Sequence, residues 1–303
     1  MQEFLQYTLN GLSVGSIYAL IALGYTMVYG ILGMINFAHS EIYMIGAFGA
    51  FYFAKYFSEP LGFNSPSILF FTLGLLVSCL VAGLVGFLIE KLAYKPLRSS
   101  PKLNVLITAI GVSMLFQFGG QIIFGADPKP FPVFIQDQAL FEIAGSPIQL
   151  IDVMIYVVSF LSLGTLSYIV LKTQTGRAMR AVSHRPDITP LMGIHNDRII
   201  STIFIIGSVL AGVASILVAM KYPKIDPMMG IKMGMSSFVA AVLGGIGSLH
   251  GAVVGAFILA LSESYLIGYG ASTYREGLAF VILIFILLYK PTGIFGKKMK
   301  EKI

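Results

Sequence analysis

One stretch within the first long apolar region carries side chains that could do chemistry. It runs from Met34 to Glu41 and presents an amide at Asn36, an imidazole at His39, a hydroxyl at Ser40 and a carboxylate at Glu41. Polar and charged groups at membrane depth are costly, so they usually face a cavity or one another. Asn36, His39 and Glu41 are therefore candidates for lining a solute pathway. The alternative is an interfacial turn in which Asn36 or Ser40 caps the next helix.

A second candidate is the turn-rich segment from Gly244 to Gly251, where Gly244, Gly245 and Gly247 follow a short apolar run. A helix broken inside a membrane leaves backbone N–H and C=O groups free to meet a polar solute. These three glycines are therefore included with the pathway candidates.

The connector between residues 173 and 196 is both basic and apolar. Its apolar side chains include Met179, Val182, Leu191 and Met192. A segment that only joined two helices would not need them. We expect an amphipathic element that docks into a groove on a soluble partner. The alternative is that the element lies on the anionic membrane surface.

Motifs typical of enzymes and metal sites do not occur in the sequence. There is no Walker A pattern, so the chain by itself has no P-loop for ATP, and there is no HExxH pair or GxSxG elbow. The single cysteine, Cys79, allows neither an intramolecular disulfide nor a cysteine metal cluster. We predict a protein that is not an enzyme and that has no cofactor or metal. The four histidines lie in different segments, at His39, His184, His195 and His250.

The elements that must hold these candidates are membrane-spanning helices. Hydrophobic residues make up 56% of the 303 residues and charged residues only 11%, against about 25% charged in soluble domains. The apolar residues fall in long uncharged runs near or above the roughly 18–20 residues that cross a bilayer as a helix. The runs do not alternate as barrel strands would. We predict an all-α polytopic helix bundle, in which residues 1–303 form a single transmembrane domain. The first run lacks a preceding Lys or Arg and is too long for a cleavable signal peptide, so we expect it to remain as a helix.

Charge sets the orientation of the bundle. The positive-inside rule places three basic segments in the cytoplasm. Residues 125–152 are acidic and proline-rich, and we expect them to form an irregular external loop. The basic segments are Lys91–Lys102, Lys172–Arg198 and Lys290–Lys302.

Two apolar segments are too short to span a bilayer as straight helices. They are Ile42–Ala54 and Met233–Leu243, one in each half of the chain. Such a pair of short or broken helices is the best sequence indication of a transport pathway. They bring the predicted count to about eight or nine membrane segments. They also leave the side of the N-terminus open, since it depends on whether the first one crosses.

Two further features keep alternatives open. Glu263 ends a long uncharged stretch and either pairs with Arg275 or Lys232 or lies at the water interface. Glycines at helical spacing, such as Gly11 and Gly15, allow close helix contact either within the subunit or between subunits.

Several blocks in order along nearly the whole chain resemble the LivH-type permeases of branched-chain amino acid ABC importers. Ser40, where the family commonly has glycine, and His184-Arg185 depart from the usual pattern. The matching blocks are Gly15–Leu20, Ile35–His39, Thr175–Ala181, Gly193–Ile194, Phe238–Ser248 and Pro291–Gly296.

This resemblance implies a multi-pass protein of the bacterial cytoplasmic (inner) membrane, surrounded by lipid. The implied partners are a homologous second permease subunit, two cytoplasmic ATPase subunits and an external solute-binding protein, with no nucleic acid. It also implies that the loop from Gly176 to Ile194, within the cytoplasmic coupling loop of residues 173–196, contacts an ATPase. The coupling residues expected there are Gly176, Arg177, Met179, Arg180, Ala181, Leu191 and Gly193.

Two other functions remain open. Related permeases also carry urea and short amides. A stand-alone channel or secondary carrier would need titratable groups at mid-depth, for which Glu41 and Glu263 are the candidates. ATP-driven import of branched-chain or other hydrophobic amino acids is the expectation that the resemblance favours.

Overall fold

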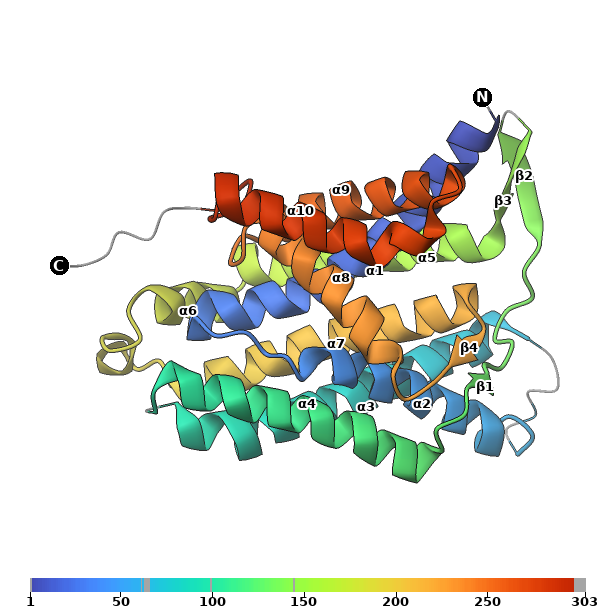
Figure 1. The fold of residues 1–303 in the computed structure, drawn as a ribbon. Helices are drawn as coiled ribbons and strands as arrows, with labels where there is room; N and C mark the ends of the chain where they lie inside the picture. Colours follow the sequence, from blue (N-terminus) through green and yellow to red (C-terminus); the bar gives the residue numbers. More distant parts are fainter. Residues whose placement is uncertain (1, 61, 63–65, 99, 144, 297–303) are drawn as a thin grey trace.

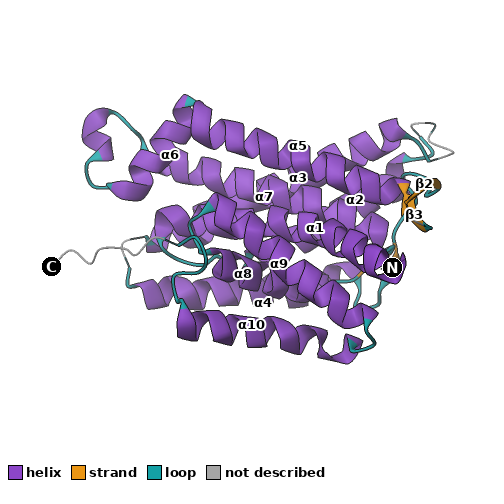
Figure 2. Ribbon diagram, turned by 90° about the horizontal axis from the view of Figure 1, so that it is seen from above, coloured by secondary structure: helices purple, strands orange, loops and turns teal. Residues whose placement is uncertain are grey.

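The computed structural model describes residues 2–296 except 61, 63–65, 99 and 144 (Figure 1). The basic residues at 297–302 that supported the cytoplasmic C-terminus lie outside the described residues. The structure is an all-α bundle, as predicted, and it also has small strands at one end (Figure 2). The helices are α1 Gln2–Leu32, α2 His39–Phe57, α3 Ile68–Ile89, α4 Lys102–Phe124, α5 Leu150–Lys172, α6 Gln174–His184, α7 Asn196–Lys221, α8 Met229–Gly244, α9 Leu249–Gly268 and α10 Arg275–Tyr289.

Within the described chain, seven helical segments are long and apolar enough to cross a membrane. They are α1, α3 with its continuation to Leu97, α4, α5, α7, α9 and α10 with its preceding turn. With α2 and the shorter α8 they account for the eight or nine segments expected. The continuation of α3 is a π-helical turn at Glu90–Tyr94 followed by a 3-10 turn at Lys95–Leu97.

The centre of the bundle is formed by α1 and α7, whose side chains are mostly buried. In contrast, α4, α5 and α10 bury few residues and present large apolar side chains outward, including Ile122, Leu161 and Leu288. Exposed apolar surface on this scale is not tolerated in a monomeric soluble protein. The outer helices therefore face lipid or other subunits.

Glycines bring the central helices close together. A Cβ added to Gly15 would lie 3.2 Å from the Cα of Phe257, and one at Gly11 would lie 3.1 Å from the Cα of Leu261. Both contacts join α1 to α9 within the chain. The glycine spacing at these two positions therefore serves packing inside the subunit, which was one of the two alternatives.

The two ends of the bundle are distinct (Figure 1). The Ser146 hydroxyl donates to the carbonyl of Gln2 at 3.2 Å, so the N-terminus lies beside the acidic loop. The basic helix α6 lies at the opposite end, together with the described end of the C-terminal segment. The positive-inside rule then predicts that the N-terminal end is external and that α6 is cytoplasmic.

The external loop is more regular than predicted. Strands β2, Ala139–Ile143, and β3, Ser146–Gln149, form an antiparallel hairpin. Strands β1, Lys129–Pro130, and β4, Lys224–Ile225, pair antiparallel and tie this loop to the segment after α7. The prediction of an irregular loop was wrong here because register between short strands is set by tertiary contacts and not by local composition.

Candidate functional site

Helix α2 begins inside the bundle. A Cβ on Gly24 would overlap the His39 imidazole, so the start of α2 lies beside a point in α1 that is about 12 Å before its cytoplasmic end at a rise of 1.5 Å per residue. Residues 33–38 therefore run back into the bundle from the cytoplasmic side. Helix α2 is longer than the apolar run Ile42–Ala54 predicted, because it also includes the charged residues Glu41 and Lys55.

Helix α8 begins inside the bundle from the other side. Residues 222–225 are held at the external end by β4 and by the N–H of Phe131 donating to Pro223 O at 3.1 Å. The first turn of α8 nevertheless contacts α2: a Cβ on Gly230 would lie 2.6 Å from Ser40 O. The N-terminal turns of α2 and α8 thus meet at mid-depth, since the chain enters the bundle from opposite ends before these two helices.

The Glu41 carboxylate lies at this meeting point and is fully buried. Its Oε1 accepts hydrogen bonds from Gln117 Nε2 at 2.8 Å and from the hydroxyls of Ser40 and Ser113, each at 3.2 Å. Its Oε2 has no hydrogen-bond partner among the described residues. A buried acceptor without a partner is costly, which is typical of a group that has a ligand to bind.

A cavity of about 200 Å³ borders Glu41 between α1, α2, α4 and α8. Ser40, Glu41, Ser113 and Gln117 make its polar part. The rest of the lining is largely aromatic and aliphatic, from Tyr25, Phe37, Ile110, Met114, Ile231, Gly234, Met235 and Phe238. One carboxylate edge beside an apolar wall suits a small molecule with an amine at one end and a hydrocarbon side chain at the other.

Asn36 anchors the segment that leads into α2. Its Oδ1 accepts from the Ala38 N–H at 3.1 Å and from the Tyr94 hydroxyl at 2.8 Å, while its buried Nδ2 has no described partner. Helix α2 follows Ala38 and has no side-chain cap. The alternative in which Asn36 or Ser40 is its N-cap is therefore wrong. The bond to Tyr94 instead joins this segment to the end of α3.

His39 packs in the core and does not line the cavity. Its ring lies 4.9 Å from that of Tyr25 in an edge-to-face arrangement, and only 1% of the residue is exposed. Its Nε2 has no partner among the described residues. The contact with Gly24 requires glycine in α1, because a Cβ there would take the space of the imidazole.

The structure separates Gly244, Gly245 and Gly247 from Glu41. Gly234 lies beside Ser40, and Gly244 is ten residues further along α8, or about 15 Å. The glycine turn instead meets the C-terminal segment, where Ile294 N–H donates to Leu243 O and Phe295 N–H to Gly244 O, each at 2.9 Å. Gly245 and Gly247 have positive φ angles of 108° and 94°, which favour glycine.

Helix α6 is fastened to the bundle along one face. Thr173 caps it by accepting from the Gly176 N–H at 3.1 Å, and a Cβ on Gly176 would overlap backbone carbonyls at the end of α5. Arg180 donates to one of these, Val170 O. Met179 is buried, so it anchors the helix and does not present an apolar surface to a partner. Ala181 is partly buried, whereas Arg177 is exposed.

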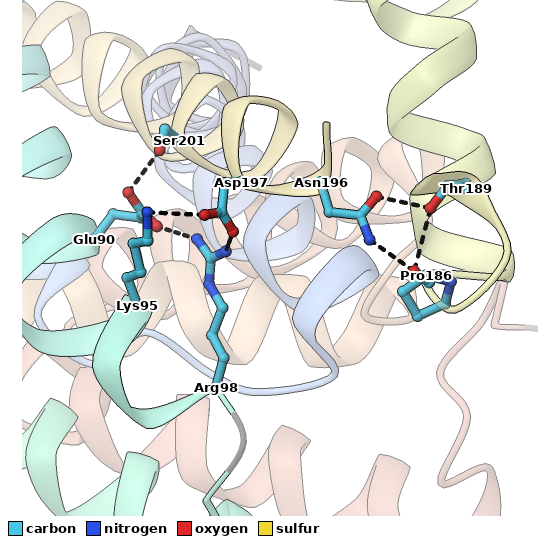
Figure 3. Close-up of polar contacts among 8 residues, drawn as sticks. All are labelled: Glu90, Lys95, Arg98, Pro186, Thr189, Asn196, Asp197 and Ser201. Carbon is cyan, nitrogen blue, oxygen red and sulfur yellow. Dashed lines mark hydrogen bonds and ion pairs between the residues drawn. The ribbon is translucent and has the colours of Figure 1, made fainter. Parts of the chain in front are cut away.

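The short 3-10 turn after α6, Thr189–Met192, presents the apolar surface that is available. Leu191 is 86% exposed and Met192 75%, and the following Gly193 has φ of 77°. The turn is held by Asn196, which accepts from the Thr189 hydroxyl at 2.7 Å and donates to Pro186 O at 2.7 Å (Figure 3). A fixed turn with two exposed apolar side chains is suited to insertion into a groove.

A neighbouring polar network was not foreseen from the sequence (Figure 3). Glu90 is buried at the end of α3, pairs with Arg98 and accepts from the Ser201 hydroxyl at 2.7 Å. Arg98 also binds Asp197 at 2.6 Å, and Lys95 binds Asp197 at 2.8 Å. The one signal in the sequence is Glu90, a single acid directly before the basic segment Lys91–Lys102. That segment indicates orientation and does not by itself predict an ion-pair network. The network ties α3 to the first turn of α7, which follows the Thr189–Met192 turn in the chain.

Glu263 pairs with Arg275, one of the two partners considered, at 2.8 Å. Lys232, the other, pairs with Glu276 at 3.2 Å. Among the described residues no three His, Cys, Asp or Glu side chains are grouped as metal ligands would be.

Comparison with known proteins gives a consistent picture. A family model described as the branched-chain amino acid transport system permease component matches residues 7–287. The chain is 40% identical to the high-affinity branched-chain amino acid transport system permease protein BraD of Pseudomonas aeruginosa, over 99% of this chain and 98% of that one. It is 39% identical to LivH of Escherichia coli strain K12, over the same shares of the two chains.

More distant similarity extends beyond amino acid permeases. The chain is 30% identical to a probable branched-chain amino acid transport permease, LivH, of Methanocaldococcus jannaschii, over 93% of this chain and 90% of that one. It is 25% identical to the ribose import permease protein RbsC of Haemophilus influenzae, over 96% of this chain and 86% of that one. No solved structure matches the chain significantly.

Proposed function

Because this chain belongs to the branched-chain amino acid transport system permease family, we propose that it carries branched-chain amino acids across the cytoplasmic membrane as the permease subunit of an ATP-driven importer. It is a multi-pass membrane protein and a transporter subunit, not an enzyme. The observation that carries the proposal is similarity to amino acid permeases along nearly the whole chain. The cavity beside Glu41 supports it, since its lining is apolar except at one edge.

In this proposal the pathway passes the meeting point of α2 and α8. The free Oε2 of Glu41 receives the ammonium group of the substrate, and the apolar wall formed by residues such as Phe238 receives the branched side chain. Asn36 and His39 position the segment that carries Glu41. Gly244, Gly245 and Gly247 form the cytoplasmic end of α8 and its turn into α9. A group that binds only in one state of the bundle couples substrate to conformational change.

We further propose that residues 173–196 are the coupling element. Arg177, Leu191 and Gly193, with Met192, make the contact with an ATPase subunit, because they are exposed at the cytoplasmic end. Gly176, Met179, Arg180 and Ala181 hold α6 on the bundle, so that force on the turn reaches α5 and α7. The remaining partners are a homologous second permease subunit, a second ATPase and an external solute-binding protein.

The proposal is tested by reconstitution in proteoliposomes. The chain is co-purified with a second permease subunit and two ATPase subunits, and uptake of labelled leucine, isoleucine and valine is measured with a loaded binding protein outside and ATP inside. We expect uptake that requires ATP and is abolished when the ATPase cannot hydrolyse it. Uptake without any ATPase subunit would support a stand-alone carrier. Preferential uptake of urea or acetamide would support the amide alternative.

A further inference from the structure

A second and larger cavity, of about 660 Å³, lies at the external end of the bundle. It is bordered by α1, α5, α7, α9, the start of α10 and residues 131–137 of the external loop. Part of its lining is apolar, including Val14, Ile151 and Ile267. The pathway residues predicted from the sequence do not border it.

One ion pair in this cavity joins α5 and α7. Lys221 pairs with Asp152 Oδ1, which also accepts from the Ser13 hydroxyl at 2.8 Å. The two charged side chains are 13% and 18% exposed. Asp152 lies in the first turn of its helix and Lys221 in the last turn of its own, so both helix dipoles favour these charges. The bonds all use Oδ1, and Oδ2 has no partner among the described side chains.

A second ion pair lines the same cavity. Arg275 Nε donates to Glu263 Oε2 at 2.8 Å, and Arg275 Nη2 donates to the Tyr18 hydroxyl at 2.9 Å. Tyr18 in turn donates to Glu263 Oε2 at 2.8 Å. Glu263 is 2% exposed, whereas Arg275 is 35% exposed. No described residue binds Arg275 Nη1, so one edge of the guanidinium remains available.

The Lys221–Asp152 and Arg275–Glu263 ion pairs line the same cavity. Tyr222, which follows Lys221, also lines the cavity. Partial burial raises the pKa of its phenol, Arg275 lowers that pKa, and Asp152 and Glu263 raise it further. Charges from both pairs therefore reach the same hydroxyl.

We propose that this external cavity is a recognition site for the zwitterionic head group of an α-amino acid. The proposal rests on the proposed function and deepens it. The free edge of Arg275 binds the α-carboxylate, since guanidinium matches carboxylate geometry. Asp152 Oδ2 binds the α-ammonium, and the hydrocarbon side chain lies against Val14, Ile151 and Ile267. Solute released by a binding protein at the external face then meets this site before the smaller cavity at Glu41.

The charge arrangement favours a zwitterion over a simple ion. Each ion pair is neutral in itself, and the Asp137 carboxylate, whose Oδ1 accepts from the Ile151 N–H, adds one negative charge to the lining. A monovalent cation or anion would satisfy one free edge and leave the other unmatched. A zwitterion satisfies both with no change in net charge, which limits the cost of desolvation.

The site is tested by protection of a cysteine placed in it. In a Cys79→Ser background of the complete importer, Asn10→Cys places a thiol on the cavity wall, and Leu140→Cys on the exposed hairpin is the control. The rate of modification by a membrane-impermeant methanethiosulfonate is measured without ATP. We expect millimolar L-leucine to slow modification of Asn10→Cys several-fold and to leave Leu140→Cys unchanged. N-acetyl-L-leucine and L-leucinamide, which each lack one of the two charges, are expected not to protect.

A second variant links protection to the charged groups. Asp152→Asn is expected to abolish protection by leucine while the rate without leucine stays the same, which shows that the cavity is intact. Equal protection by all three compounds, or none by leucine, would overturn the inference even if Asp152→Asn failed to assemble. ATP-driven leucine uptake by the Cys79→Ser importer, without thiol modification, would then show that the proposed function stands and that only the external site is wrong. Absence of that uptake would count against the proposed function instead.

Discussion

Glu41 and Gly230 face each other across the junction of α2 and α8: a Cβ on Gly230 would lie 3.0 Å from Glu41 Oε2. The same Cβ would lie 2.6 Å from Ser40 O. Only glycine allows α8 to come this near to the carboxylate. Glu41 Oε2 is therefore enclosed by the α8 backbone, which can approach it because Gly230 has no side chain.

Gly230→Ala is expected to destabilise the junction. The added methyl meets backbone, which cannot move aside as a flexible side chain can, and overpacking of this kind costs roughly 1–3 kcal/mol. We expect a lower thermal midpoint of the purified complex and slower leucine uptake. Gly277→Ala is the matched control, since a Cβ there would meet nothing within 4 Å. Equal midpoints for the two variants would contradict the packing described here.

Glu41→Gln removes the charge while retaining the size of the side chain. A charged hydrogen bond contributes roughly 1.5–3 kcal/mol, so loss of the contact to the ammonium group should lower uptake about tenfold or more. The stability of the bundle should not fall, because among the described residues no cation pairs with Glu41. Glu59→Gln, at an exposed turn, is the control. Uptake by Glu41→Gln at the level of the control would remove Glu41 from the pathway.

Leu191→Asp combined with Met192→Asp tests the coupling turn. Both side chains are exposed, so the permease itself should fold and insert normally. Replacing apolar contacts with charge should reduce copurification of the ATPase and ATP-driven uptake together. Leu140→Asp, on the external hairpin, should change neither. Unchanged copurification would instead favour the alternative in which this element lies on the membrane surface.

In the polar network at the end of α3, the loss of stability on substitution should be larger for a buried ion pair than for an exposed one. Arg98→Gln leaves Glu90, whose side chain is 1% exposed, without its cation, and breaking a buried pair costs about 3–5 kcal/mol. Asp197→Asn should cost far less, because that carboxylate is 57% exposed. Thermal midpoints of the single variants and of the Glu90→Gln/Arg98→Gln double variant give the comparison. A double variant no more stable than Arg98→Gln would argue against a buried charge as the cause.

The sequence predicted the helical class and the short α8, because the length of an apolar run indicates how much of the chain can lie in lipid. The sidedness drawn from loop charge stays a prediction, and α2, with 19 residues, is longer than its apolar run indicated. The sequence could not predict where α2 begins. Glu41 reads as a boundary in sequence, yet it is buried by Ser113 and Gln117 from α4, far along the chain. Only tertiary contacts make a carboxylate compatible with a helix interior at that depth.

The functional role of the candidate site stays a prediction. The Met34–Glu41 stretch contributes Phe37, Ser40 and Glu41 to the lining of the inner cavity, but the sequence could not distinguish Glu41 from its buried neighbour His39. In the coupling connector, Met179 and Leu191 look alike by composition, and only the fold shows that one is buried and the other exposed. The charged residues of the external cavity come from α5, α7, α9 and α10, so no local pattern joins them.

Helix α8 spans the distance between the glycine turn and Glu41 without a proline. At about 1.5 Å per residue its sixteen residues make a strut of roughly 24 Å. Its cytoplasmic end is held by the C-terminal segment and its other end is wedged against Ser40. We expect a helix held at both ends to move along its axis as a rigid body. A displacement of α8 near Gly244 would then change the volume of the cavity beside Glu41.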